Sequence, residues 1–417
     1  MPRSLALALV LAAACPAGPV TDATLSNDAV RARVKLNPFA LEVVRAADDA
    51  VLLKSSGPPR ATRDNPEFIS QLLPGWDGYR AKEGDWHSAD GGIISEVTDT
   101  SLKVTFEGFT LDVSLDGPRV KLAAATTQAG LNKLAVPFTF GADEHVFGSG
   151  ERYASFDHRG LNLYSWAEEA GLGGGEAPAP GPENPFPNGP SMTYFPMPFF
   201  QSSAGYAVSL DTTRRTELDF GAASGSEWRA VVNGTALAMT VYAGDPVQVL
   251  DLWTQDTGRP PEPSPWVWGP RRRIGRGSMV NGMPEWQAMR DAGLPLTACD
   301  DAMHFLPALS HLGVEAALRA WTQTLHDNGF KAIGYNNPYV AASHMNAAAD
   351  YAYGADAGFF ETAPGGEPAT TFFISGAPLY ISAVDLTNPA AVQWYETLLQ
   401  RGVDLGYDGW MHDFGEY

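Results

Sequence analysis

Cysteine is almost absent from this chain of 417 residues, which contains only Cys15 and Cys299. If Cys15 is removed or lipidated on export, Cys299 has no partner within the chain, which excludes an intrachain disulfide. Basic residues are also scarce: the chain contains 28 Lys and Arg but 48 Asp and Glu, which gives a net charge of −20. This charge repels phosphate backbones and anionic membrane surfaces, so it argues against a nucleic-acid partner and favours a neutral ligand.

The apolar run near the N-terminus is short. Residues 5–14 follow Arg3 and cannot span a bilayer, which is typical of a secretory signal. Three alanines directly before Cys15 indicate a bacterial lipoprotein signal that lipidates Cys15, and ordinary cleavage near Ala17 is the alternative. We therefore predict a signal peptide over residues 1–21. The protein is expected to be exported: periplasmic, extracellular, or an outer-membrane lipoprotein anchored through Cys15.

The composition that remains is that of a folded protein of more than one domain. Hydrophobic residues make up 44% of the chain and charged residues 18%, and the length predicts two to three domains. Over residues 22–255, apolar residues alternate with polar ones and glycine or aspartate turns separate the runs. The alternation is clearest at Leu102, Val104 and Phe106. This pattern predicts a β-sandwich domain.

Two segments interrupt the strands. Residues 171–198 are dense in glycine and proline, which favours a long surface loop. Residues 256–265 include four prolines between Pro260 and Pro265, which predicts a stiff linker. We expect the domain boundary there.

After the linker the pattern alternates between strand and helix. We predict strands at residues 266–274, 294–299, 331–335 and 409–414, with helices at 284–291, 314–325 and 389–400, the last capped by Gly402. Such alternation predicts a parallel sheet. Four strands are half of the eight in a (β/α)8 barrel, which needs about 250 residues. The expected fold class is therefore multidomain β plus α/β: a sandwich followed, over residues 266–417, by the first half of a TIM barrel.

Acidic side chains stand at the carboxyl ends of two of these strands. Asp413 and Glu416 stand at the end of the last one, and Asp300 and Asp301 follow the second. The carboxyl ends of barrel strands carry the catalytic residues of this fold, although solvated loop acids would give the same pattern. His412 beside Asp413 is a weak metal signature, and we predict no metal site.

The chain resembles glycoside hydrolase family 31. The resemblance covers most of the chain and rests on several motifs in the same order, namely residues 147–152 with 157–160, 194–200, 337–340, 384–389 and 409–417. The last of these, Gly-Trp-Met-His-Asp-Phe-Gly-Glu-Tyr, is similar to the nucleophile strand of the sulfoquinovosidase-like branch.

The resemblance implies roles for individual residues. Asp413 would be the nucleophile of a retaining mechanism, with Glu416 or Arg152 supporting the site from close range. Asp301, or Asp300 if the alignment shifts by one residue, would bind hydroxyls of the sugar, with His304 and Trp410 as further contacts. No cofactor is implied, because two carboxyl groups suffice for the reaction.

The chain departs from the sulfonate-binding pattern of that branch, which uses two Gln, an Arg and a Trp. Arg276 stands at the first Gln position, and the second falls near Asp301, where an acidic side chain would repel a sulfonate. We therefore expect an α-glucosidase-like enzyme acting on an oligosaccharide or other α-glycoside, with a sulfoquinovosidase as an alternative.

In the family the acid/base carboxyl group lies on a later strand than the nucleophile. We therefore expect these 417 residues alone to be inactive. A non-catalytic carbohydrate-binding fragment or degenerate relative is the alternative from another class. The sequence leaves the sugar, the linkage and the oligomeric state open.

Overall fold

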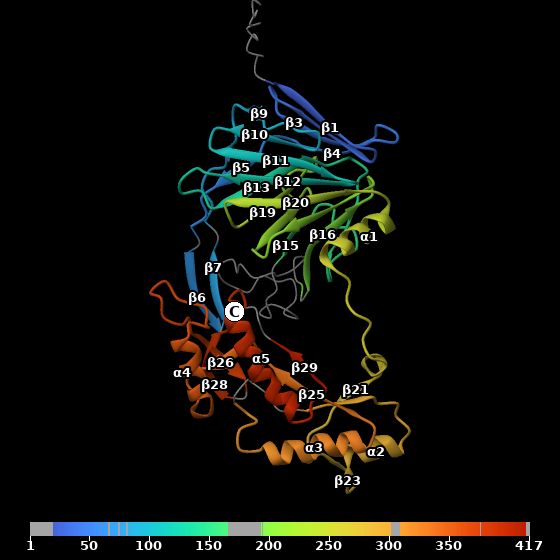
Figure 1. Ribbon diagram of the computed structural model, residues 1–417, viewed down its shortest axis with the longest axis vertical. Helices are drawn as coiled ribbons and strands as arrows, with labels where there is room; N and C mark the ends of the chain where they lie inside the picture. The colour runs from blue at the N-terminus through green and yellow to red at the C-terminus, as the bar shows by residue number, and fades with distance from the viewer. Residues whose placement is uncertain are drawn as a thin grey trace, which may run out of the picture. The chain divides into compact units, whose positions relative to one another are not determined.

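The computed structural model describes residues 20–65, 67–73, 76–80, 82–165, 193, 195–301, 309–375 and 377–413. Cys15 with most of the predicted signal peptide, most of the loop at 171–198, His304 and Glu416 lie outside these residues. The chain forms two compact units: residues 1–69 with 79–259, and residues 70–78 with 260–417 (Figure 1). We call them the sandwich unit and the barrel unit. The division falls between Arg259 and Pro260, inside the proline-rich segment.

Two large antiparallel sheets dominate the sandwich unit. One has the order β14-β16-β17-β20-β12-β11-β10-β9 and the other β15-β18-β19-β13-β5-β8. The strands of the first are β9 (Ile93–Ser95), β10 (Ser101–Phe106), β11 (Phe109–Asp116), β12 (Arg119–Thr126), β14 (Val146–Gly150), β16 (Pro196–Ser202), β17 (Tyr206–Asp211) and β20 (Ala236–Ala243). Those of the second are β5 (Arg60–Thr62), β8 (His87–Ser88), β13 (Lys133–Thr139), β15 (Asn162–Ser165), β18 (Thr216–Asp219) and β19 (Glu227–Val232).

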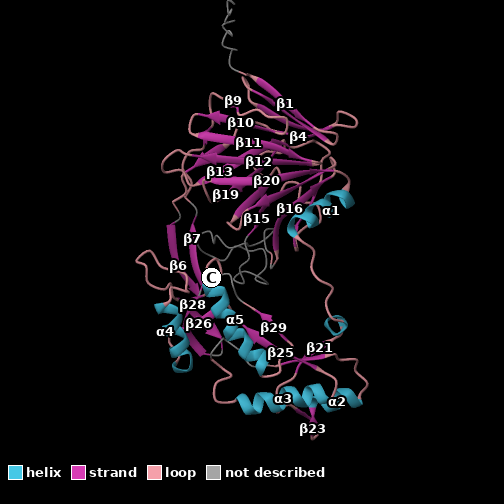
Figure 2. Cartoon of the chain, viewed as in Figure 1, coloured by secondary structure: helices cyan, strands magenta, loops and turns pink. Residues whose placement is uncertain are grey.

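A third sheet adds to the same core. Its strands are β1 (Asp22–Ser26), β2 (Val30–Lys35), β3 (Ala40–Arg45) and β4 (Val51–Lys54). A separate pair, β6 (Glu67–Leu73) and β7 (Trp76–Arg80), includes residues 70–78, which are counted with the barrel unit. One hydrophobic cluster includes Val43 of the third sheet, Val104 of the eight-stranded sheet and Trp228 of the six-stranded one. The alternation predicted for residues 102–106 is confirmed, because Leu102, Val104 and Phe106 are buried in that cluster. Figure 2 shows that the sandwich unit consists mostly of strands.

One helix of the sandwich unit was not predicted. α1 (Pro246–Thr257) begins with a capping box between Asp245 and Gln248, and Pro246 stands in its first turn, where proline is tolerated. Val249 is its only buried residue, so the apolar period that would reveal the helix in the sequence is weak. The sequence analysis therefore included most of this segment in the β-sandwich domain without predicting a helix.

The barrel unit contains a parallel sheet of the order β21-β24-β25-β29. Its strands are β21 (Arg271–Arg273), β24 (Ala298–Asp300), β25 (Lys331–Asn336) and β29 (Gly409–His412), and its helices are α2 (Glu285–Asp291), α3 (Glu315–Asp327), α4 (Ala348–Asp356) and α5 (Pro389–Asp404). The fold class expected from the sequence, a sandwich followed by part of a TIM barrel, is confirmed. No helix in the described part of the chain combines the length and apolarity needed to cross a bilayer.

Smaller elements complete the barrel unit. β26 (Tyr339–Ala341), β28 (Ala377–Ala383) and β27 (Thr371–Ser375) form an antiparallel sheet that the sequence analysis missed, and β22 (Met279–Val280) pairs with β23 (Met283–Pro284). Two 3-10 helices, η2 (Pro265–Trp268) and η3 (Met345–Ala347), connect these elements.

Three expected boundaries were wrong. Residues 266–274 form η2 and then the short strand β21, because Gly269 and Pro270 interrupt the segment. β24 starts only at Ala298, since Pro295 has no backbone N–H for the sheet. Gly402 lies inside α5 and does not cap it; the helix continues to Asp404, and Gly406, with φ of 93°, follows its end.

Candidate active site

The two faces of the parallel sheet carry different side chains. Cys299 of β24 and Ala332 of β25 pack in a buried cluster with side chains of α3, and we call this side the helix face. Because side chains alternate along a strand, Asp300 and Tyr335 point to the opposite side, the inner face. Cys299 is a buried free thiol, and burial raises its pKa to about 12, so it is not a nucleophile at neutral pH.

Asp413 is held on the inner face at the carboxyl end of β29. Its Oδ2 accepts a hydrogen bond from the phenol of Tyr335, which lies on the neighbouring strand β25. The contact joins residues that are 78 positions apart in the sequence. Hydrogen bonds to an ionised carboxylate are among the stronger ones, so this contact orients the Asp413 carboxylate toward one rotamer.

The backbone of Asp413 is fixed as well. Its N–H donates to the carbonyl of Asn336 at 2.9 Å, and its own carbonyl accepts from Nδ2 of Asn337 at 2.7 Å. Asn337 is fully buried, and its carbonyl accepts from the phenol of Tyr395 on α5 at 2.9 Å. Asp413 is thus tied to β25 and, through Asn337, to α5.

Trp410 and His412 lie on the other side of β29. His412 Nε2 is 3.3 Å from the phenol oxygen of Tyr395 on α5, and Trp410, two residues earlier, shares its side of the strand. The structure therefore does not bring Trp410 to the face that carries Asp413. Burial lowers the pKa of His412, which keeps its ring neutral at pH 7. Among the described residues, no three His, Cys, Asp or Glu side chains gather closely enough to hold a metal ion.

Asp301 is buried and directed to the helix face. Only 6% of it is exposed, and its Oδ2 accepts a hydrogen bond from the phenol of Tyr407 at 2.6 Å. Tyr407 belongs to the cluster that packs against α3. The structure therefore places Asp301 on the opposite face from Asp413, where it supports the packing of the sheet.

Asp300 is the last residue of β24. It lies on the inner face of β24, the strand that pairs directly with β25. Its Oδ1 is covered from solvent, and none of the described residues donates a hydrogen bond to that atom. Asp300 therefore shares the face of the sheet that carries Asp413, whereas Asp301 does not.

Arg276 lies near the Asp301 and Tyr407 pair. Burial and the negative charge of Asp301 raise the pKa of Tyr407 well above its usual range, and the positive charge of Arg276 opposes that rise. The Arg276 side chain is exposed. It is therefore a cation in the turn that follows β21.

Arg152 belongs to the sandwich unit, where its guanidinium donates hydrogen bonds to backbone carbonyls. Nε donates to the carbonyl of Ser149 at 2.8 Å and an Nη donates to that of Tyr164 at 2.9 Å. Burial lowers the pKa of Arg152 to about 10. The Gly-Ser-Gly motif before it is required sterically, because a Cβ at Gly150 would overlap the carbonyl oxygen of Phe195.

The sequence analysis missed the residues that support the two carboxylates. Tyr335, Asn337 and Tyr407 each make a hydrogen bond to Asp413 or Asp301. Asn337 stood in a recognised motif at the end of a strand, which was a usable signal. Tyr335 and Tyr407 resemble ordinary core tyrosines, so nothing in the pattern distinguished them.

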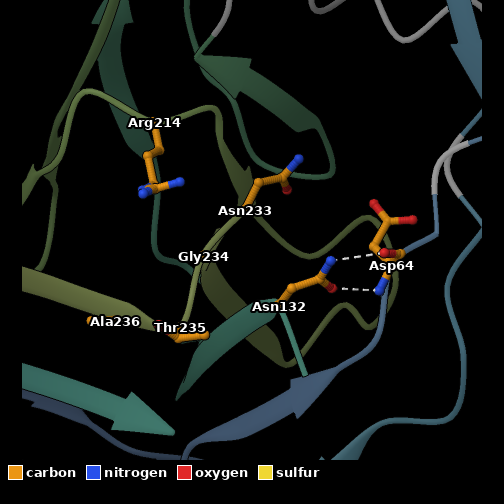
Figure 3. A pocket seen from close by; sticks show the side chains of 7 residues that line it. All are labelled: Asp64, Asn132, Arg214, Asn233, Gly234, Thr235 and Ala236. Carbon is orange, nitrogen blue, oxygen red and sulfur yellow. Dashed lines mark hydrogen bonds between the residues drawn. The ribbon is translucent and has the colours of Figure 1, made fainter. Parts of the chain in front are cut away.

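A cavity of about 450 Å³ in the sandwich unit does not offer comparable chemistry. It is lined by Asp64, Asn132, Arg214, Asn233, Gly234, Thr235 and Ala236 (Figure 3). The Asn132 amide is occupied by the backbone of Asp64, with hydrogen bonds of 2.7 and 2.8 Å. The Asp64 carboxylate accepts from the backbone N–H of Lys82 at 2.9 Å. The side chains of Asn132 and Asp64 are therefore engaged in hydrogen bonds between neighbouring segments of the chain.

Two protein-family models match this chain. Residues 19–219 match the glycosyl hydrolase 31 N-terminal galactose mutarotase-like domain, and residues 314–417 match the glycosyl hydrolases family 31 TIM-barrel domain. The second range includes Tyr335 and Asp413. Both units therefore match models of one family, in the order in which they occur here.

Relatives and solved structures agree with these matches. A sulfoquinovosidase of Agrobacterium fabrum is 28% identical to this chain, and the match covers 74% of this chain and 47% of that protein. The alpha-xylosidase XylQ of Lactiplantibacillus pentosus is 26% identical, and the match covers 76% of this chain and 40% of that protein. This chain spans about half the length of these relatives. A GH31 family sulfoquinovosidase from E. rectale, solved in complex with an aza-sugar inhibitor, has the same fold, with a TM-score of 0.72, 18% identity and coverage of 95% of this chain and 59% of that one.

Proposed function

Because this chain belongs to glycoside hydrolase family 31, we propose that it carries the nucleophile side of a retaining α-glycosidase site and that Asp413 is the nucleophile. The observation that carries the proposal is the hydrogen bond between Tyr335 and Asp413 at the carboxyl edge of the parallel sheet. Catalytic groups of barrel enzymes lie at this edge. The second carboxylate on the same face, Asp300, then binds hydroxyls of the sugar.

The proposed chemistry follows from this arrangement. Tyr335 holds Oδ2 of Asp413, which leaves Oδ1 to attack the anomeric carbon. A bond forms between Oδ1 and that carbon while the glycosidic C–O bond breaks, and an acid protonates the leaving oxygen. Water then hydrolyses the glycosyl ester with retention of configuration.

The acid must be a second carboxylic acid about 5–5.5 Å from the nucleophile. By the family resemblance it lies on a later strand, outside the residues that the structure describes. The inactivity expected of these 417 residues alone therefore remains a prediction. A carbohydrate-binding role without catalysis is the competing function.

The substrate we propose is a neutral α-glycoside, with glucose or xylose at the non-reducing end. The carboxylate of Asp300 on the inner face disfavours a sulfonate by charge repulsion. A sulfoquinovosidase remains the second candidate, because two of the relatives above carry that name and Arg276 lies near the sheet. Export, with or without a lipid on Cys15, is our proposal for the location.

The choice of substrate tests the proposal directly. In the active protein that contains these residues, p-nitrophenyl α-glucoside or α-xyloside should be hydrolysed with a kcat/KM at least about tenfold above that of the matching α-sulfoquinovoside, since one unfavourable charge contact is worth several kcal/mol. Initial rates with the three aryl glycosides measure this. A preference for the sulfonated substrate would reject the neutral assignment in favour of the second candidate.

Asp300 and Asp301 form a matched pair for a second test. Asp300→Asn should lower kcat/KM by about 10²-fold with little change in melting temperature, because it removes a charged acceptor that meets the sugar. Asp301→Asn should mainly lower the melting temperature, because it weakens a buried hydrogen bond to Tyr407. Steady-state kinetics and thermal melting of both variants separate the roles. The reverse result would restore Asp301 as the residue that binds the sugar.

A further inference from the structure

One face of the eight-stranded sheet carries Phe199 and, beside it, a row of three polar side chains. Register pairs Phe199 of β16 with Ser209 of β17, Ser209 with Thr240 of β20, and Thr240 with Lys121 of β12. Residues that are paired in register point to the same face. Their chain neighbours Phe200, Val208, Val241 and Val120 fill the sandwich core, so the row lies on the opposite face.

Aromatic side chains stand beside this row. Trp253 of α1 stacks on Phe199 with ring centroids 4.4 Å apart and an interplanar angle of 20°. Tyr242, two residues after Thr240, belongs to the small apolar cluster that joins α1 to the sheet. The face therefore combines hydroxyl groups with an aromatic wall.

These groups line a cavity of about 650 Å³ that is open to solvent on one side. Among its lining residues are Lys121, Ser209, Asp211, Thr240, Trp253 and Asp256. Cavities that bind small ligands typically measure 300–1,000 Å³ and combine apolar walls with a few fixed polar groups. This cavity has the size and the composition of such a site.

The wall formed by α1 is held in place independently of any ligand. Oδ2 of Asp256 accepts hydrogen bonds of 2.9 Å from both Nε of Arg119 and the phenol of Tyr242. The capping box at Asp245 secures the other end of the helix. A preformed wall lowers the cost of ordering the protein when a ligand binds.

We propose that this α1 cavity binds a neutral oligosaccharide, at a site separate from Asp413. A pyranose ring presents one apolar C–H face and a rim of hydroxyls. The aromatic wall of Trp253 fits the former, and the hydroxyls of Ser209 and Thr240 fit the latter. Two of the charged groups at the lining are already paired, Asp256 with Arg119 at 2.9 Å and Lys121 with Asp116 at 3.0 Å. Asp211 adds a further acidic side chain, which disfavours an anion. The residues of the site belong to the sandwich unit, whereas Asp413 belongs to the barrel unit.

The test is calorimetric titration of the 417-residue protein carrying Asp413→Asn, so that no ligand is hydrolysed. The probes are maltotriose, isomaltotriose and, as an anionic comparison, trigalacturonate. Thr240→Val removes one hydroxyl without changing the side-chain volume, and Trp253→Phe keeps the apolar contact with Phe199. Each should weaken binding of a neutral trisaccharide by about five- to tenfold, the effect of one hydrogen bond or aromatic contact.

Val247→Ala is the matched control, because Val247 is an exposed residue of α1 that does not line the cavity. It should leave the affinity unchanged. Unaltered affinity in both lining variants, absence of trisaccharide binding at millimolar concentration, or tighter binding of trigalacturonate would each overturn the proposal. Loss of aryl-glycoside hydrolysis bears only on Asp413, so the two proposals fail by different observations.

Discussion

Replacing Asp413 by asparagine lowers kcat for α-glycoside hydrolysis by about 10⁴-fold or more, because the amide cannot form the glycosyl ester through which a retaining mechanism passes. The fold is retained, since Asn keeps the backbone hydrogen bonds to Asn336 and Asn337 and its amide can still accept from Tyr335. Single-turnover and steady-state kinetics of the active protein that contains these residues measure the loss.

Covalent labelling identifies the attacking atom independently. A fluorinated α-glycoside inactivator should leave its sugar on the peptide that contains Asp413, and the Asp413→Asn variant should not be labelled. Tyr335→Phe is the matched comparison, because it removes only the hydrogen bond to the carboxylate and should still be labelled, more slowly. A label on Glu416 would show that the nucleophile lies three residues further along the chain.

The largest expected effect on stability concerns Lys133 in the sandwich unit. Lys133 is 2% exposed, and its Nζ donates hydrogen bonds to Glu83 and Glu217. Lys133→Met should lower the free energy of unfolding by about 2–3 kcal/mol, because the buried Glu217 loses its closest cation and keeps Arg215, whose Nη1 is 3.3 Å from Oε1. Urea unfolding followed by tryptophan fluorescence measures the change.

Lys54→Met is the control for this variant. Lys54 makes an ion pair with Glu42 at 3.0 Å, but its side chain is 48% exposed, so the loss should stay below about 1 kcal/mol. Equal effects of the two substitutions would show that burial does not control the strength of these pairs.

The same cluster predicts a dependence on pH. Burial disfavours the charged forms of both Lys133 and Glu217. The negative charge of Glu217 and the hydrogen bonds to Glu217 and Glu83 outweigh burial and raise the pKa of Lys133. In turn, the positive charge of Lys133 outweighs burial and lowers the pKa of Glu217. The contribution of Glu217 to the free energy of unfolding is therefore present above about pH 4.3 and is lost as the pH falls through the folded pKa of Glu217. The contribution of Lys133 is present below about pH 10.4 and is lost as the pH rises through the folded pKa of Lys133. The stability difference between wild type and Lys133→Met should shrink at acidic pH.

The sequence by itself determined much of the architecture. The alternation at residues 102–106 identified a strand with one buried face, because period two is a local property of the chain. The apolar face of residues 314–325 predicted α3, because the helical period is also a local property of the chain. The family motif predicted Asp413 as the nucleophile, which stays a prediction. These features can be read from neighbouring residues and need no knowledge of what packs against them.

Tertiary structure decided what the local pattern could not. Asp300 and Asp301 are adjacent acids in the sequence, so the local pattern does not tell them apart. The hydrogen bond from Tyr407, which packs on the helix face, shows that Asp301 points away from the inner face that carries Asp413. The Tyr335 contact and the α1 cavity depend on strands that are distant in sequence and adjacent in the sheet. Strand register and burial are set by the whole fold, which is why these partners could be identified only after the sheets were assembled.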